Sequence, residues 1–169
     1  MNQPLIILGS ARSRGNTRHL VNTIFQKKDH DLIDLNEHNI NYYTYDNRHT
    51  DDDFIALAKR MVQYDHIVFA TPIYWYSMSA QLKTFFDRMT DLVTVRKDLG
   101  RNLINKTLYS ISCGSDSDLP EGFTVPFEAT AVYLDMRYGG HFQGWVEHDE
   151  IPPEVHERIT NFTKNIFKG

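Results

Sequence analysis

Cysteine is nearly absent from the sequence, because Cys113 is the only one. A disulfide framework within the chain and a metal site built from cysteines alone are therefore both excluded. Long hydrophobic runs are missing as well, and no apolar stretch approaches the roughly 20 residues that span a bilayer. The first residues, MNQPLIILG, lack the basic flank and the long apolar segment of a signal peptide. We expect a cytoplasmic protein that does not associate with membranes.

A large excess of charge of one sign is also lacking. The 22 acidic and 18 basic residues leave a net charge of -4, which argues against a nucleic-acid-binding or membrane-surface protein. The eight histidines are scattered without ligand spacing, so no metal site is expected. The chain has 169 residues and contains no linker or repeat. We therefore expect residues 1–169 to form a single domain with a substantial core.

Short apolar runs alternate with segments of helical period along the chain. The runs lie at 5–8, 32–35, 67–70, 108–112 and, more weakly, 142–146. Helical stripes of apolar residues lie at 54–62, 78–89 and 155–166, with a fainter one at 127–134. This alternation predicts an α/β fold with a five-stranded parallel sheet of order 2-1-3-4-5 and helices on both faces. Irregular segments are expected at 36–49, 91–105 and 112–125, and a turn at Gly139 and Gly140.

The first apolar run is followed by GSARSRGNTRHL, residues 9–20, which is too polar and too rich in glycine for a core. In an open parallel sheet, ligands bind at the carboxyl ends of the strands, where the strand order reverses. Backbone N–H groups at a helix start, small hydroxyls and an asparagine can surround phosphate oxygens. The loop therefore indicates an anion site, although an ordinary strand-to-helix turn with capping residues has a similar composition.

Three known phosphate motifs do not fit this part of the chain. Gly9 and Gly15 enclose five residues and Asn16 follows, whereas the nucleoside-triphosphate loop has four residues and then lysine. The dinucleotide fingerprint needs glycine where Ala11 stands. The cysteine-phosphatase loop would need arginine where Leu119 stands. The pattern favours a phosphate monoester.

A second loop, TPIYWYSMSAQLKTFFDR at residues 71–88, follows the third apolar run. Its Pro72 fixes φ, so the loop starts in a set direction. The run YWY at 74–76 then places three aromatic residues beside the strand end. We expect one or two of them to pack in the core, since three adjacent residues cannot all face inward. The backbone of residues 73–77 is suited to pair with the polar edge of a flavin ring.

The pattern GSxRxxGNTxxL followed by TPxYxxxxxxxLKxFxDR resembles the NAD(P)H-dependent FMN reductase and quinone oxidoreductase branch of the flavodoxin-like superfamily. The resemblance covers nearly the whole chain, through NKTLYSISCGS at the fourth run. It implies a flavodoxin-like three-layer sandwich, FMN as cofactor and NADPH or NADH as co-substrate. The residues that it implies for the FMN phosphate are Ser10, Arg12, Ser13, Gly15, Asn16 and Thr17. Those that it implies for the isoalloxazine ring are Pro72, Ile73, Tyr74, Trp75, Tyr76 and Ser77, with Cys113, Gly114 and Ser115 at the other edge.

The resemblance also implies an oxidoreductase that passes electrons from NAD(P)H through FMN to a small acceptor such as a quinone or free flavin. No side chain is then an obligate catalytic acid or base, and the protein is expected to be a homodimer or homotetramer. A non-enzymatic FMN electron carrier or a flavin-dependent regulator is the alternative. A nucleotide hydrolase or transferase of the same fold is disfavoured by the aromatic loop.

Three further features concern residues outside the expected flavin site. Residues 36–49 contain no cysteine, unlike the corresponding segment of related iron–sulfur flavoproteins, so no cluster is expected there. The tyrosines of this segment, Tyr42, Tyr43 and Tyr45, either cover the flavin, line a subunit contact or are merely solvated. In the second motif, Lys83 and Asp87 are spaced to pair on a helix, and we expect Asp87 and Arg88 to have a structural or interface role.

Overall fold

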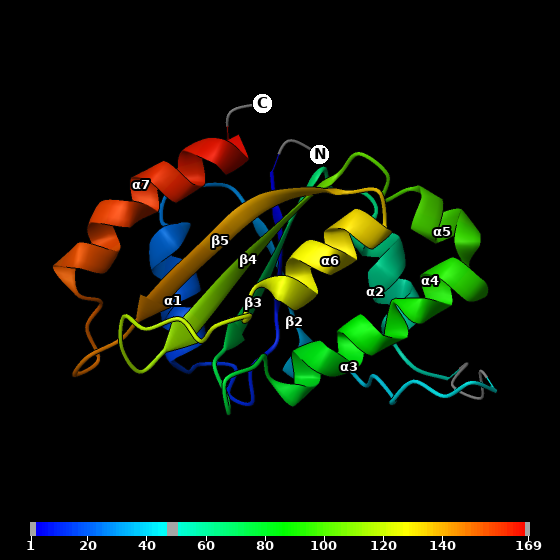
Figure 1. The fold of residues 1–169 in the computed structure, drawn as a ribbon, viewed down its shortest axis with the longest axis horizontal. Coiled ribbons are helices and arrows are strands. Elements are labelled where there is room, and N and C mark those ends of the chain that lie inside the picture. Colours follow the sequence, from blue (N-terminus) through cyan, green and yellow to red (C-terminus); the bar gives the residue numbers. More distant parts are fainter. Residues whose placement is uncertain (1–2, 47–50, 168–169) are drawn as a thin grey trace.

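Five parallel strands pair in the order β2-β1-β3-β4-β5 in the computed structural model, which describes residues 3–46 and 51–167 (Figure 1). The strands β1, β3 and β4 are buried along nearly their whole length, as expected for a sheet covered on both faces. The predicted order is confirmed, and every predicted apolar run overlaps a strand. The bounds are β1 (Leu5–Leu8), β2 (Asp31–Asp34), β3 (His66–Pro72), β4 (Thr107–Gly114) and β5 (Arg137–Trp145).

Helices cover both faces of the sheet (Figure 1). The helices α1 (Asn16–Ile24) and α7 (Pro153–Phe167) pack on one face. The opposite face is covered by α2 (Phe54–Met61), α3 (Ala80–Arg88) and α6 (Val125–Tyr133). The predicted three-layer arrangement is therefore confirmed. In the part of the chain that the structure describes, no helix combines the length and apolar character needed to cross a membrane.

Two predictions about irregular segments are wrong. Residues 91–105 contain most of α4 (Thr90–Thr94) and all of α5 (Lys97–Arg101), each too short to show an apolar stripe. Gly139 and Gly140 lie within β5 at a bulge rather than in a turn. A side-chain carbon at Gly139 would come within 2.2 Å of the Tyr109 ring, and Gly140 has a φ of +117°. Both positions therefore require glycine.

Helix α3 ends at a buried arginine, Arg88. Its guanidinium donates to the carboxylate of Asp52, to Asp91 Oδ2 at 2.9 Å and to the carbonyl oxygen of Asn41 at 3.1 Å. Burial alone would raise the pKa of Asp52, but hydrogen bonds from Arg88 and from backbone amides hold it below its usual value. Arg88 thus has a structural role, as predicted, since it ties α3 to α4 and to the segment that precedes α2.

Candidate functional site

The carboxyl ends of β1, β3 and β4 bring the predicted loops together at the lower edge of the sheet in Figure 1. The N–H of Gly9, after β1, donates to the carbonyl of Ala70 in β3 at 2.8 Å. The N–H of Ile73, after β3, donates to the carbonyl of Cys113 in β4 at 3.0 Å. The loops that follow these strands are therefore neighbours, as the sequence predicted for a ligand site at the point where the strand order reverses.

The first loop presents hydrogen-bond donors at the start of α1. The leading N–H groups of a helix have no acceptor within it, and Gly15, which precedes α1, supplies no capping side chain. The first turn of α1 also contains no acidic residue. Arg12 and Arg14 are exposed on the same loop. Donors, the positive end of the helix dipole and nearby cations make this a site that suits a phosphate group.

The polar residues of the first loop differ in their surroundings. The Ser10 side chain is buried, and its Oγ accepts a 3.4 Å hydrogen bond from the Arg12 N–H. Ser13 Oγ accepts from Asn36 Nδ2 at 3.2 Å, a contact to the segment after β2 that sequence reasoning missed. Thr17 is buried, and its hydroxyl interacts with the Cys113 thiol. Thr17 therefore offers a ligand at the start of α1 its backbone N–H and not its hydroxyl.

Cys113 lies near the end of β4, within the strand rather than in a loop. Burial raises the pKa of its thiol to about 11, partly offset by the hydrogen bond with Thr17. The thiol is therefore protonated near neutral pH and is a poor nucleophile. Cys113 therefore packs at the end of β4 and is not a candidate catalytic residue.

The second loop forms a tight hairpin. Tyr74 and Ser77 exchange backbone hydrogen bonds of 2.9 and 3.1 Å, and the two residues between them, Trp75 and Tyr76, have φ values of +46° and +65°. Both lie in the left-handed region, which favours glycine and asparagine in such turns. The three aromatic residues are 43%, 92% and 75% exposed in chain order. The expectation that one or two of them pack in the core is wrong, because the turn projects all three outward.

A cavity of about 510 Å³ lies between this hairpin and the loop that follows β4. Its volume falls in the range of small-molecule sites. Two carboxylates, Asp116 and Asp118, stand among its lining residues together with aromatic and aliphatic groups, and none of these residues is a cation. The lining residues are Ile73, Trp75, Tyr76, Gly114, Ser115, Asp116, Asp118, Leu119 and Pro120. Five of the predicted ring-binding residues therefore share one cavity. The loop after β4, residues 115–120, lies in a predicted irregular segment, but its carboxylates Asp116 and Asp118 were not among the predicted site residues; we call it the acidic loop.

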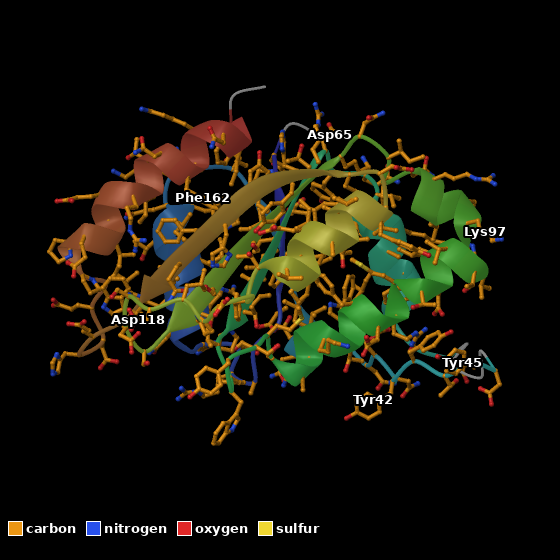
Figure 2. The ribbon with its side chains drawn as sticks, in the orientation of Figure 1. Tyr42, Tyr45, Asp65, Lys97, Asp118 and Phe162 are labelled. Atoms are coloured by element: carbon orange, nitrogen blue, oxygen red, sulfur yellow. The ribbon has the colours of Figure 1, made fainter. Side chains whose placement is uncertain are left out.

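The tyrosines of the segment after β2 do not line this cavity. Figure 2 shows Asp118 at one end of the lower edge of the molecule, and Tyr42 and Tyr45 at the other end, beyond α3. Tyr42 instead borders a smaller hollow of about 210 Å³ with Ala80 and Gln81 at the start of α3. Within one chain these described tyrosines are placed away from the expected ring site.

Comparisons with known proteins agree with the resemblance. The sequence profile of the NADPH-dependent FMN reductase family matches residues 4–121. The Bacillus subtilis protein YwqN, provisionally named an NAD(P)H-dependent FMN-containing oxidoreductase, is 31% identical over 150 residues, which are 82% of each chain. The solved structure of the Trp repressor binding protein from Bacillus subtilis superposes with a TM-score of 0.73 at 26% identity over 96% of both chains. An NADPH-quinone reductase from P. pentosaceus gives a TM-score of 0.64 at 21% identity, again over 96% of both chains.

Proposed function

The chain belongs to the NADPH-dependent FMN reductase family, and from this premise we propose that it passes electrons from NAD(P)H through FMN to a neutral, flat acceptor such as a quinone or free flavin. That the protein is an NAD(P)H-dependent flavin oxidoreductase follows from the family. The acceptor is our proposal. The observation that carries it is the cavity between the aromatic hairpin and the acidic loop.

The residues of the first loop fit the phosphate of FMN. We propose that Arg12 supplies the charge and that the N–H groups of Gly15, Asn16 and Thr17 supply dipolar donors, with the hydroxyls of Ser10 and Ser13 beside them. The uncapped start of α1 supports this assignment most directly for Asn16 and Thr17, whose N–H groups have no acceptor within the helix. The Gly15 N–H donates to the carbonyl oxygen of Arg12 at 3.2 Å, which holds the loop against the start of the helix. A charge-assisted hydrogen bond to phosphate contributes about 1.5–3 kcal/mol.

The cavity fits a flat ring system. We propose that the ring lies between the hairpin at residues 72–77 and the end of β4, at Cys113, Gly114 and Ser115. When bound, FMN supplies the redox chemistry, because it takes electrons from a nicotinamide and passes them to an acceptor. The chain binds and orients the reactants. Backbone groups of the hairpin fix the polar edge of the ring, and the exposed faces of Trp75 and Tyr76 offer surfaces on which a second flat molecule can stack.

The charge of the cavity supports a neutral acceptor. Asp116 and Asp118 line it without a compensating cation among the other lining residues. A cleft lined by charge of one sign repels ligands of the same sign and attracts those of the opposite sign. Neutral quinones are therefore favoured over anionic ones.

We also propose that two copies of the chain associate through α6. Val132 and Tyr133 are each 74% exposed on this helix, and a groove of about 500 Å³ separates it from α3 and α4. Lys83 and Asp87, which pair with each other at 2.6 Å, line the groove, so a twofold axis would bring the same charged pair of each copy to the interface. The change Ala129→Glu places a charge in the groove and should lower the mass measured by sedimentation, whereas Ala56→Glu, at an exposed position of α2, should not.

Anaerobic mixing tests the proposed reaction. Purified protein loaded with FMN is mixed with NADH or NADPH, and the flavin absorbance is followed. We expect one nucleotide to bleach the flavin and 1,4-naphthoquinone to restore the oxidised spectrum. Reduction by dithionite but by neither nucleotide would overturn the proposal in favour of an electron carrier or regulator.

A further inference from the structure

A hydrogen-bond chain of buried and half-buried polar side chains runs along β4 and β5 beneath the site. Tyr138 Oη lies 2.9 Å from Ser110 Oγ, and Ser110 Oγ lies 2.8 Å from His141 Nδ1. His141 Nε2 lies 2.8 Å from Ser112 Oγ, which donates to Gln143 Oε1. Gln143 Nε2 donates to the carbonyl oxygen of Asp116 at 3.2 Å. Ser110 and Ser112 are fully buried, and the chain connects the middle of the sheet to the acidic loop.

The carbonyl oxygen of Asp116, at the end of this hydrogen-bond chain, fixes which group donates in every hydrogen bond of the chain. A backbone carbonyl only accepts, so the amide nitrogen of Gln143 must face Asp116 and its oxygen must face Ser112. The single proton of Ser112 is thereby used, and Ser112 Oγ must accept from His141 Nε2.

The imidazole then has one consistent state. Its Nε2 carries the proton, and its Nδ1 accepts from Ser110, whose oxygen accepts in turn from Tyr138. Burial lowers the pKa of His141 to about 4, so the ring is neutral near pH 7 and has the one donor and one acceptor that the chain requires. A doubly protonated ring would have to donate from Nδ1 and would break this direction.

The chain ends at the wall of the cavity. Gly114, Ser115 and Asp116 line the cavity, and a side-chain carbon at Gly114 would come within 2.8 Å of Gln143 Nε2. The wall therefore lies directly on Gln143. The Asp116 carboxylate accepts hydrogen bonds from Ser115 Oγ and from the Asp118 N–H, each at 2.9 Å. These bonds continue the hydrogen-bonded network of the wall as far as residue 118.

We propose that Gln143, oriented through Ser112 by the Nε2–H tautomer of His141, is a positioning residue that holds the Gly114–Asp116 wall in the shape that receives the flavin ring. This proposal rests on the proposed function for the identity of the ring. The hydrogen bonds that hold the Gly114–Asp116 wall in place belong to the protein itself and do not depend on the ligand. Gln143 touches no reacting atom and acts through the backbone of Asp116. Its loss is expected to weaken ring binding without affecting the phosphate site.

The test uses Gln143→Glu, which keeps an acceptor for Ser112 but replaces the donor to Asp116 by an oxygen. Amide hydrogen exchange at residues 115–118 in the FMN-free protein should become about tenfold faster, as expected for loss of one hydrogen bond. The affinities for FMN and for riboflavin should fall by the same factor. Ser112→Ala, which is one hydrogen bond further from Asp116, should also speed exchange and weaken both flavins, but by smaller factors. Gln26→Glu, at an exposed position just after α1, is the matched control and should change neither quantity.

The wild-type protein provides a readout that needs no variant. The ¹⁵N spectrum of its histidines, with His141 assigned by comparison with His141→Gln, should show the Nε2–H tautomer near pH 7. The Nδ1–H tautomer, or a folded Gln143→Glu protein with unchanged exchange and unchanged riboflavin affinity, would overturn the proposal. If wild-type protein bound no FMN at all, the proposed function would fail, whereas the exchange and tautomer results would still decide the role of Gln143.

Discussion

The Ser79 hydroxyl donates a 2.8 Å hydrogen bond to the carbonyl oxygen of Gly9, so the residue that caps α3 also holds the start of the first loop. The same Oγ accepts from the Leu82 N–H at 3.2 Å, and the Ser79 N–H donates to Thr71 Oγ1 at 2.9 Å. All three partners are buried. The two proposed binding segments, one for the phosphate and one for the ring, are therefore linked through a single side chain.

Replacing Ser79 by alanine should affect both stability and ligand binding. The change removes a helix cap, which costs about 0.5–2 kcal/mol, and leaves the buried Gly9 carbonyl without this donor. We expect urea unfolding to show a loss of about 2–3 kcal/mol and FMN titration to show weaker binding. Ser79→Thr keeps the hydroxyl and is the control. Equal behaviour of the two variants would contradict the role given to this hydroxyl.

Removing the charge of Arg12 should discriminate between phosphate and ring binding. Arg12→Ala is expected to weaken FMN binding by about ten- to a hundredfold, the equivalent of one charge-assisted hydrogen bond, and riboflavin binding much less. Fluorescence titration with both flavins measures the difference. Arg101→Ala, an exposed site on α5, should leave both affinities unchanged. Similar losses for the two flavins would place Arg12 away from the phosphate.

The parts of this fold that the sequence predicted well are those with a strong hydrophobic signal. The run Leu5–Leu8 is wholly buried and coincides with β1, because a strand covered on both faces must be continuously apolar. Helices α2 and α3 follow the predicted stripes for a similar reason, since one face of each is buried. By contrast, α4 and α5 have five residues each, too few for a period to be read.

The candidate site was predictable where composition reflects chemistry and unpredictable where it depends on tertiary contacts. The glycines, serines and arginines of the first loop indicate an anion site by their residue types alone. The outward projection of Trp75 and Tyr76 depends on a turn that glycine or asparagine usually forms, so the sequence did not reveal that all three aromatic residues face outward. The contact of Gln143 with the Asp116 carbonyl joins residues 27 positions apart, and no local pattern marks it.

The buried cation of α3 should be far more important for stability than the exposed pair one turn earlier. Arg88→Met leaves Asp52 and Asp91 without their cation in a buried site, which we expect to cost about 3–5 kcal/mol. Lys83→Met breaks the exposed 2.6 Å pair with Asp87 and should cost less than about 1 kcal/mol. Urea unfolding of both variants provides the comparison. Losses of equal size would show that the Arg88 network is not stabilising in the way its burial implies.

The acidic loop should control the choice among acceptors. Asp118→Asn removes one carboxylate from the cavity lining. The repulsion between an exposed carboxylate and an anionic acceptor in the same cavity is roughly 0.5–1 kcal/mol in a medium close to water. We expect kcat/KM for the anion 1,4-naphthoquinone-2-sulfonate to rise about two- to fivefold, with the neutral 1,4-naphthoquinone unchanged. High salt should reduce the difference through screening. Asp135→Asn, at the opposite end of the sheet, is the matched control, and the same gain there would remove the acidic loop from the explanation.

Protonation of His141 should make the protein less stable in mild acid. Burial lowers the pKa of this imidazole from 6.5 to about 4 in the folded chain, so the unfolded chain binds the extra proton first as the pH falls. The contribution of the neutral His141 to the free energy of unfolding is fully present above pH 6.5 and is lost between pH 6.5 and about 4. The loss is up to ~1.4 kcal/mol for each pH unit, or about 3 kcal/mol in total.

The change His141→Gln isolates this contribution. His66, whose pKa burial also lowers, and the carboxylates of Asp31, Asp52 and Asp65, whose pKa values are lowered, titrate in both proteins. The difference between the two urea-unfolding free energies, measured at several pH values from about 7 to about 4.5, therefore reports His141 alone. We expect the wild-type advantage to shrink steadily as the pH falls. Parallel curves would mean that His141 binds its proton equally well in the folded and unfolded chains, and that its burial does not lower its pKa.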